Sequence, residues 1–128
     1  MTSQTASLPK PKGPYATTYR VGDVLYLSGQ GSIDPVSGET VLGDIREQTT
    51  NTLANIEALL ISEGFALADL AQVTCYLTNM ADWPAMNEAY ASYLGERAQP
   101  VRTAVEVAAL PFGLNVEVTC IAHRKGSC

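Results

Sequence analysis

The order of apolar patterns along the chain limits the possible fold more than any other feature. Two stretches, residues 45–63 and 83–94, have the 3.6-residue spacing of amphipathic helices. Five others have the alternation or β-branched content of strands: residues 16–21, 24–28, 71–77, 101–107 and 116–123. The order strand, strand, helix, strand, helix, strand, strand predicts an α+β domain, in which two helices pack on one face of a mixed β-sheet.

Local signals predict where these elements begin and end. Asp44 is expected to cap the first helix and Gly64 to end it. Asp82 is expected to open the second helix and Gly95 to end it. Gly22-Asp23, between the first two strands, indicates a two-residue hairpin.

The strands have apolar residues at both parities, which indicates a sheet with two apolar faces. The segments "VTCYL" and "VTCIA" are apolar along most of their length, and the 101–107 strand is rich in valine. Two helices cover only one face, and no third helix is predicted. The second face therefore predicts oligomerisation through the sheet.

Length and charge narrow the classes of protein. The 128 residues suit one domain, expected at 13–125, with a flexible N-terminal arm at 1–12 and a short C-terminal tail at 126–128. A net charge of −5 disfavours nucleic acid as the main partner. No apolar run reaches the length that crosses a bilayer, so no membrane partner is expected.

The numbers of cysteine and histidine residues indicate the cellular compartment and limit the metal sites that the chain can form. Three cysteines and an N-terminus without an apolar signal region indicate reduced thiols and a cytoplasmic protein. Cys75 and Cys120 are expected to act as small apolar side chains within strands. With one histidine and no metal-type cysteine spacing, we expect neither a metal nor a cofactor.

Two charged residues, Arg102 and Glu117, interrupt strands that otherwise appear buried. One interpretation is a structural ion pair between them, or between Arg102 and Glu106 on the same strand; this is the commoner arrangement in proteins. The other is a site in which the arginine binds a ligand carboxylate with two parallel N–H donors, beside a carboxylate that accepts a proton. The residues alone leave both open.

Seven ordered segments resemble the RidA/YjgF family of reactive imine deaminases. The segments are "GPY" at 13–15, "LSGQ" at 27–30, "DPVSGE" at 34–39, "NTLANIEALL" at 51–60, "MNEAY" at 86–90, "PVRTAVEVAALP" at 100–111 and "VEVTCIA" at 116–122. The resemblance implies a chorismate-mutase-like fold, assembled as a homotrimer around a sheet-lined barrel. Its sites would lie in clefts between subunits, and this assembly would cover the second face of the sheet.

The resemblance also implies roles for particular residues. Arg102 would bind the substrate carboxylate, and Glu117 would position the attacking water. The expected lining of the cleft is Tyr15, Ser28, Gly29, Asn87 and Ala104. The chain departs from the familiar pattern after the arginine, where Thr103-Ala104 stands in place of the usual Ser-Cys. A cysteine side chain therefore cannot act there, but hydrolysis by water needs no thiol.

The function that the resemblance implies is hydrolysis of small 2-imino acids and 2-aminoacrylate to 2-keto acids and ammonia. One alternative keeps the fold and takes a larger enamine acid such as 2-aminomuconate. Another is a non-catalytic protein that binds small acids or acts like a chaperone. A ribonuclease fits poorly with the net charge of −5 and the single histidine.

Overall fold

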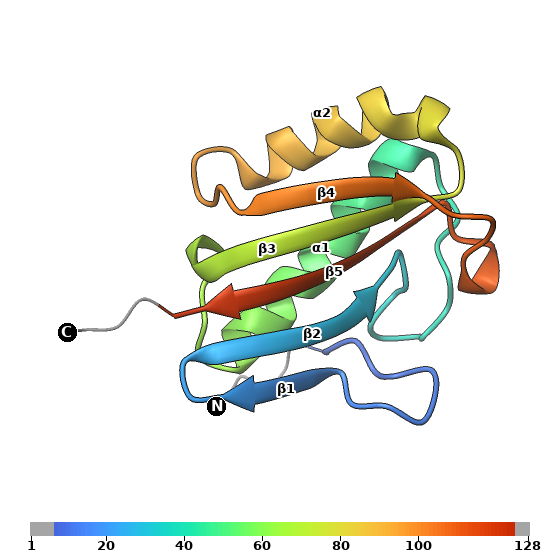
Figure 1. Cartoon of the computed structure of the whole chain (residues 1–128). Helices are drawn as coiled ribbons and strands as arrows, with labels where there is room; N and C mark the ends of the chain where they lie inside the picture. The colour runs from blue at the N-terminus through green and yellow to red at the C-terminus, as the bar shows by residue number, and fades with distance from the viewer. Residues whose placement is uncertain (1–6, 125–128) are drawn as a thin grey trace.

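The computed structural model describes residues 7–124 and contains one five-stranded mixed sheet with two α-helices (Figure 1). The strands are β1 (Thr18–Val21), β2 (Val24–Gln30), β3 (Leu70–Leu77), β4 (Val101–Glu106) and β5 (Val116–His123). The helices are α1 (Ile45–Ser62) and α2 (Trp83–Leu94), with short 3-10 turns at Leu67–Asp69, Met80–Asp82 and Pro111–Gly113. The strand order is β1-β2-β5-β3-β4, with β3 and β4 parallel and all other neighbours antiparallel. This is the predicted α+β arrangement.

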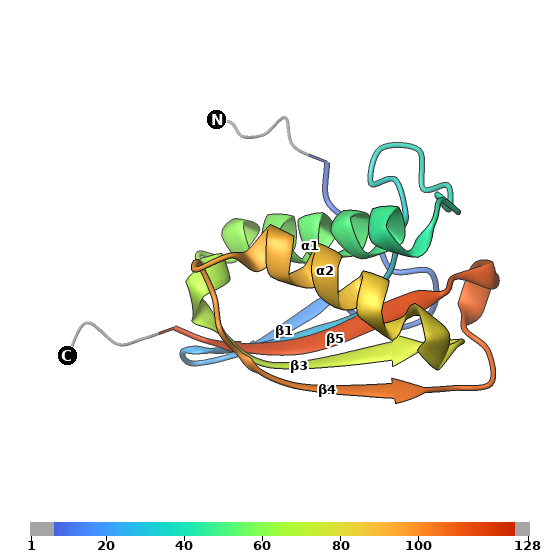
Figure 2. The ribbon, with the colours of Figure 1, turned by 90° about the horizontal axis from the view of Figure 1, so that it is seen from above.

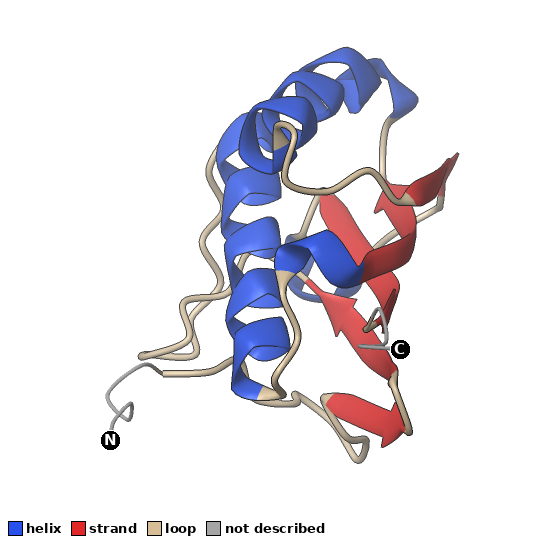
Figure 3. Cartoon of the chain, turned by 90° about the vertical axis from the view of Figure 1, so that its left-hand side faces the viewer, coloured by secondary structure: helices blue, strands red, loops and turns tan. Residues whose placement is uncertain are grey.

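Both helices lie on the same face of the sheet, as the view from above shows (Figure 2). In the side view the helices and the strands form two layers (Figure 3). The buried apolar side chains lie between these layers. Leu53, Ile56 and Leu60 of α1 are almost completely inaccessible to solvent. Burying a leucine or isoleucine side chain contributes about 1.5–3 kcal/mol, so the face of α1 toward the sheet is a principal source of stability.

The ends of α1 agree with the sequence prediction. The Asp44 carboxylate accepts a hydrogen bond from the backbone N–H of Glu47 at 2.8 Å. Gly64 follows the helix with φ +82°, a conformation that residues with a Cβ rarely adopt. The N–H groups of Gly64 and Phe65 then donate to the carbonyls of Ile61 and Leu60. These two bonds form a Schellman motif, which satisfies carbonyls left free at the helix end.

The start of α2 differs from the prediction. Asp82 precedes the helix, but its backbone is already helical and its side chain makes no capping bond. The cap lies one turn earlier, where the Asn79 side chain accepts a hydrogen bond from the Ala81 N–H at 2.9 Å. A 3-10 turn between them leads directly into α2. Gly95 ends the helix with φ +54°, as predicted.

Strand boundaries move by one or two residues at several ends, and one strand differs in burial. β1 begins at Thr18 rather than residue 16, and β2 extends to Gln30. The strand at 101–107 was expected to have at least one buried face. As β4 it lies at the sheet edge, and none of its residues is fully buried in the described chain. An edge strand has a neighbour on one side only, which explains this exposure.

The face of the sheet opposite the helices has no cover in the chain itself. Cross-strand register places Tyr26, Ile121, Gln72 and Val101 in one row on this face. Tyr26 is 47% and Val101 69% exposed. We call this surface the open face. Its exposed apolar side chains match the second apolar face that the sequence predicted.

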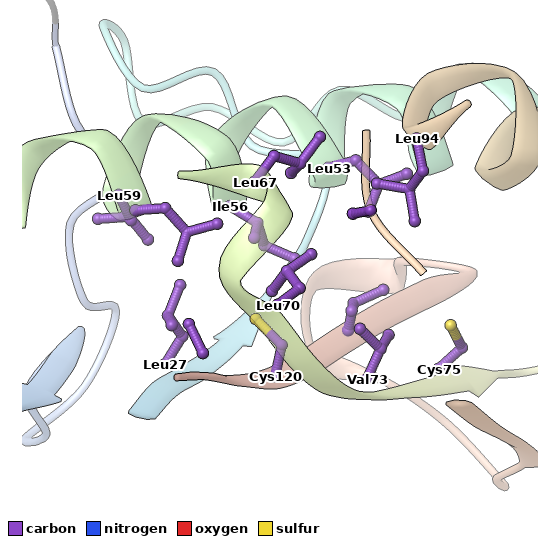
Figure 4. Packing of buried hydrophobic residues seen from close by; sticks show 14 of the residues in the cluster. Leu27, Leu53, Ile56, Leu59, Leu67, Leu70, Val73, Cys75, Leu94 and Cys120 are labelled. Carbon is purple, nitrogen blue, oxygen red and sulfur yellow. The ribbon is translucent and has the colours of Figure 1, made fainter. Parts of the chain in front are cut away.

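Cys75 and Cys120 lie in the apolar layer between the helices and the sheet, Cys120 close to Leu27 and Leu70 and Cys75 beyond Val73 on the same strand (Figure 4). Both side chains are buried. Burial raises the pKa of the Cys75 thiol to about 11 and that of Cys120 to about 12. They are packing residues, as expected from the sequence.

A buried glutamine connects α1 to the segment that precedes β5. The Gln48 amide donates to the Gly43 carbonyl at 3.0 Å and to Asn115 Oδ1 at 2.9 Å. Its oxygen accepts from the Asn115 N–H at 2.9 Å. Since Asn115 stands two residues before Glu117, these bonds fix the start of the strand that holds this carboxylate.

The ends of the domain lie partly outside the described residues, which exclude 1–6 and 125–128. The domain was expected to begin at residue 13, but Leu8 already packs against the hydrophobic core. None of the helices within residues 7–124 is long and apolar enough to cross a membrane.

We predict that Gln48→Met lowers the free energy of unfolding by about 1–3 kcal/mol. Methionine keeps the length of the side chain but leaves buried polar partners without hydrogen bonds, and each such group costs about this amount. Urea denaturation would measure the change. Thr50→Val, on the exposed side of the same helix, is the matched control and should change stability by less than about 0.5 kcal/mol. Equal losses in both variants would show that the Gln48 bonds contribute little.

We also predict that Cys75 and Cys120 resist a thiol reagent at pH 8 in the native protein and react after unfolding in guanidinium. The thiolate is the reactive form, and a pKa of about 11 leaves roughly one thiol in a thousand ionised at that pH. Peptide mass spectrometry identifies the modified positions. Rapid labelling of Cys75 in the native state would contradict its assignment as a core residue.

Candidate functional site

Four of the seven residues expected from the sequence line one cavity of about 210 Å³. Tyr15, Ser28, Gly29 and Glu117 contribute to its wall. These four residues come from three segments: the stretch before β1, the end of β2 and the start of β5. The loops at 33–38 and 111–114 complete the lining. The volume suits a small metabolite rather than a drug-sized molecule.

A bulge at the end of β2 shapes the floor of this cavity. The register between β2 and β5 shifts between Leu27 and Gln30, so Ser28 and Gly29 face a single residue of β5. A Cβ atom on Gly29 would lie 2.3 Å from Glu117 Oε2, closer than any real contact. A larger residue here would therefore displace the Glu117 carboxylate from its position against the β2 backbone.

The segment that follows β2 is held against α1 by a buried asparagine. Asn55 Nδ2 donates to the Gly31 carbonyl at 3.1 Å and to the Ile33 carbonyl at 2.9 Å. Both Gly31 and Ile33 line the cavity. The cavity wall therefore depends on a side chain of the helix more than twenty residues away in sequence.

The Glu117 carboxylate has no ion-pair partner among residues 7–124. The side chain is partly buried, and loss of hydration raises its pKa. A carboxyl group with a raised pKa and free oxygens suits general acid–base chemistry near neutral pH. Ser28, beside it, donates its hydroxyl to the Thr17 carbonyl at 3.2 Å, so its lone pairs face the cavity without a protein donor.

Arg102 lies on β4 among apolar and aromatic groups of α2. Its guanidinium carbon is 4.8 Å from the centre of the Tyr90 ring, and its Nη1 is 4.0 Å from the Met86 sulfur. No salt bridge within residues 7–124 involves Arg102. Glu106 instead accepts a hydrogen bond from the Met80 N–H. The two ion-pair interpretations of Arg102 are therefore wrong for this chain. Apart from the long contact with the Met86 sulfur, its guanidinium donors have no protein acceptor among residues 7–124.

Two polar atoms near Arg102 are buried without a partner in the described chain: Asn87 Oδ1 and Tyr90 OH. The two residues are three apart on α2 and so share one side of the helix. Burial raises the pKa of Tyr90 to about 12, so the phenol keeps its proton. Sequence reasoning named Asn87 but gave Tyr90 no role. Its three-residue spacing from Asn87 was the available signal.

Ala104 follows Arg102 on the same side of β4. It pairs with Cys75 of β3 and packs against the core. The thiol of Cys75 thus lies next to Ala104, the position at which the resemblance implies a cysteine. Its high pKa and burial make it unreactive.

The seven expected residues form two groups, and the chain does not bring the groups together. Arg102 pairs in register with Val73, whose side chain is in the core on the helix side. Glu117 pairs with Tyr76, which lies on the open face, since its neighbours Cys75 and Leu77 point into the core. Arg102 and Glu117 therefore lie on opposite faces of the sheet, with β3 between their strands.

Sequence reasoning missed the N-terminal and C-proximal walls of the cavity. Lys10 and Lys12, expected in a flexible arm, line it together with Phe112. Phe112 has φ +62°, a left-handed conformation that is uncommon for a residue with a side chain. Nothing local in the sequence marks Phe112 for this conformation, except that Gly113 follows it.

Comparisons with known proteins identify the family. A model of the family described as Endoribonuclease L-PSP matches residues 5–124. A RutC family protein of Pyrococcus horikoshii is 46% identical over 121 residues, covering 94% of this chain and 95% of that one. The 2-iminobutanoate/2-iminopropanoate deaminase of Capra hircus is 36% identical over 118 residues, covering 92% and 85%.

Solved structures have the same fold. The RidA structure from the Antarctic bacterium Psychrobacter superposes with a TM-score of 0.86 at 35% identity, covering 94% of this chain and 96% of that one. The E. coli protein TdcF, solved with bound serine, has a TM-score of 0.87 at 31% identity, covering 92% and 94%. The chain therefore belongs to the Endoribonuclease L-PSP family, which is the YjgF/RidA family.

Proposed function

We propose that this protein hydrolyses reactive 2-imino acids to 2-keto acids and ammonia, at sites formed between subunits of a homotrimer. The substrates proposed are 2-iminopropanoate and 2-iminobutanoate, and 2-aminoacrylate through its imine tautomer. The observation that supports this most directly is the pair of unpaired charges, Arg102 and Glu117, on opposite faces of one sheet. Relatives named 2-iminobutanoate/2-iminopropanoate deaminase add to the support.

The position of Arg102 and Glu117 on opposite faces of the sheet supports an oligomer with sites between subunits. A small imino acid cannot contact two groups on opposite faces of one sheet, so each half needs a second copy of the chain to complete it. The open face, with its exposed Tyr26 and Val101, offers an apolar surface for that contact. A head-to-tail interface that closes after three copies brings the β4 side of one subunit against the Glu117 side of the next.

In the proposed reaction, Arg102 of one subunit binds the substrate carboxylate with two charge-assisted hydrogen bonds. A protonated imine is already electrophilic at C2. The partner subunit's Glu117 accepts a proton from water as the oxygen bonds to C2, which gives a 2-amino-2-hydroxy acid. The same carboxyl group then returns that proton to nitrogen. As the C–N bond breaks, the carboxylate takes the proton of the hydroxyl, which becomes the ketone, and passes it to the departing ammonia. Protonated imine and water thus give keto acid and ammonium.

Arg102 is prepared for this role by its neighbours. The Tyr90 ring packs against the guanidinium. No carboxylate within residues 7–124 pairs with it, and its one contact with a protein acceptor is the long one from Nη1 to the Met86 sulfur. Holding the carboxylate and the water in fixed relation supplies much of the rate gain through orientation. None of these steps uses a thiol, which is consistent with Ala104 on β4.

Ribonuclease activity, which the name of the family model suggests, is not proposed. A net charge of −5 repels a phosphate backbone, and a chain with one histidine has no histidine pair for phosphoryl transfer. A larger enamine acid as substrate and a purely binding role are the competing functions, and the assays below distinguish them.

We predict that micromolar protein lowers semicarbazone formation when an amino-acid oxidase produces 2-iminopropanoate in the presence of semicarbazide. Glu117→Gln should reduce the rate by about 10²–10⁴-fold, because the amide keeps the size of the carboxyl but cannot accept a proton. For the wild type, kcat/KM should fall as pH drops through the raised pKa of Glu117, since the base must be ionised. No effect of the wild-type protein on imine lifetime would refute the deaminase and favour the binding role.

A subunit-mixing experiment tests the shared site. Arg102→Ala and Glu117→Gln should each be nearly inactive alone. Unfolded together in equal amounts and refolded, they should recover about a quarter of wild-type activity, because one site in four then combines an intact arginine with an intact glutamate. Light scattering should give about three times the 13.6 kDa chain mass. A stable monomer, or no recovery from a mixed trimer, would contradict sites between subunits.

A further inference from the structure

The cavity beside Glu117 contains two of the eight lysine and arginine residues of this acidic chain, Lys10 and Lys12. The proposed reaction uses neither of them. A monocarboxylic imino acid is balanced by Arg102 alone, so a further cation in the same cavity needs another explanation.

Lys12 is positioned by three contacts. Its Nζ donates to the Gly38 carbonyl at 2.5 Å and lies 6.0 Å from the centre of the Phe112 ring. Its backbone N–H donates to the Tyr15 hydroxyl at 3.3 Å. No salt bridge within the described chain involves Lys12. An ammonium group has three donors, and the carbonyl occupies one, so two are free for a ligand.

The acidic residue on this side of the cavity does not neutralise Lys12. Asp34 also lines the cavity, but its Oδ1 accepts from the N–H groups of Val36 and Ser37 at 2.8 and 3.2 Å. These bonds stabilise the turn that contains Gly38. The Gly38 N–H also donates to the Asp34 carbonyl at 2.7 Å. The aspartate therefore builds the support for Lys12 rather than pairing with it.

Phe112 supplies a second, independent observation at the same end. It is the one residue other than glycine with positive φ within residues 7–124, it lines the cavity, and 52% of its surface is exposed. Backbone strain of this kind is concentrated at functional sites. Here the strained turn holds an aromatic ring beside an ammonium group, where it adds a cation–π contact.

We propose that Lys12 binds a second carboxylate of the substrate, so that this protein prefers 2-imino acids with an acidic side chain. The inference rests on the proposed deaminase function and specifies its substrate class. Arg102 of one subunit holds the carboxylate next to the imine, and the partner subunit's Glu117 acts at C2. The side chain extends along the same cavity toward that partner's Lys12. Two cations then balance the two charges of a dicarboxylate.

The kinetic test compares substrates that differ in one group. D-Aspartate oxidase converts D-aspartate to 2-iminosuccinate, and D-amino-acid oxidase converts D-leucine to 4-methyl-2-iminopentanoate, in which an isopropyl group replaces the second carboxylate. Lys12→Met should lower kcat/KM for 2-iminosuccinate about ten-fold and leave that for the leucine-derived imine within about two-fold. Arg46→Met, on the exposed side of α1, removes the same charge outside the cavity and should change neither.

A binding test gives a result even without turnover. Calorimetry with the stable keto acids should show that the wild type binds 2-oxoglutarate more tightly than 2-oxobutanoate, and that Lys12→Met removes this preference.

Turnover of monocarboxylic imines without any effect of Lys12→Met on the dicarboxylate would overturn this inference and leave the deaminase function standing. No turnover of any imine would refute the deaminase, while a dicarboxylate preference that depends on Lys12 would then still support an acidic ligand. Equal binding of both keto acids by the wild type would overturn the role of Lys12.

Discussion

The alternation of side chains along the strands is the constraint on which the rest of this structure depends. Each residue of a strand points to the face opposite its neighbours. On β5 this places Val116 and Val118 in the core beneath the helices and Glu117 on the open face. On β4 it places Arg102 toward α2 and leaves Val101 and Val105 exposed. A shift of register by one residue would exchange these faces, bury a carboxylate in the core and destroy both halves of the site.

The same constraint explains why the two charges have no partners within the chain. An unpaired, partly buried arginine or glutamate lowers stability, since charged groups lose hydration on burial. The fold limits this cost locally. The Tyr90 ring supports the Arg102 guanidinium, and Gly29 makes room for the Glu117 carboxylate at the edge of a cavity. The unpaired charges lower the stability of a single chain, but they are free to bind a ligand or a second subunit.

Buried polar side chains of α1 connect the core to the cavity. Gln48 fixes the residues before β5, and Asn55 holds the segment after β2 that forms the cavity wall. The helix that buries Leu53, Ile56 and Leu60 thus also holds the cavity wall and the start of β5. Loss of the hydrogen bonds made by these two side-chain amides should therefore lower stability and change the geometry of the site together. A change at Lys12 should not do so, because Lys12 lies at the exposed end of the cavity.

Local pattern determined the order of elements, the Asp44 cap, the Gly64 stop and the identity of Arg102 and Glu117 as the unusual charges. These features follow from residues close in sequence, where periodicity and capping preferences act. Only the tertiary structure decided that the two charges lie on opposite faces, that Asn79 rather than Asp82 caps the turn before α2, and that Tyr90 lies beneath Arg102. It also brought Lys12 to Gly38, 26 residues away, and Gln48 to Asn115, 67 residues away. Contacts between such distant residues depend on how strands pair and helices pack, and no local preference in the sequence encodes them.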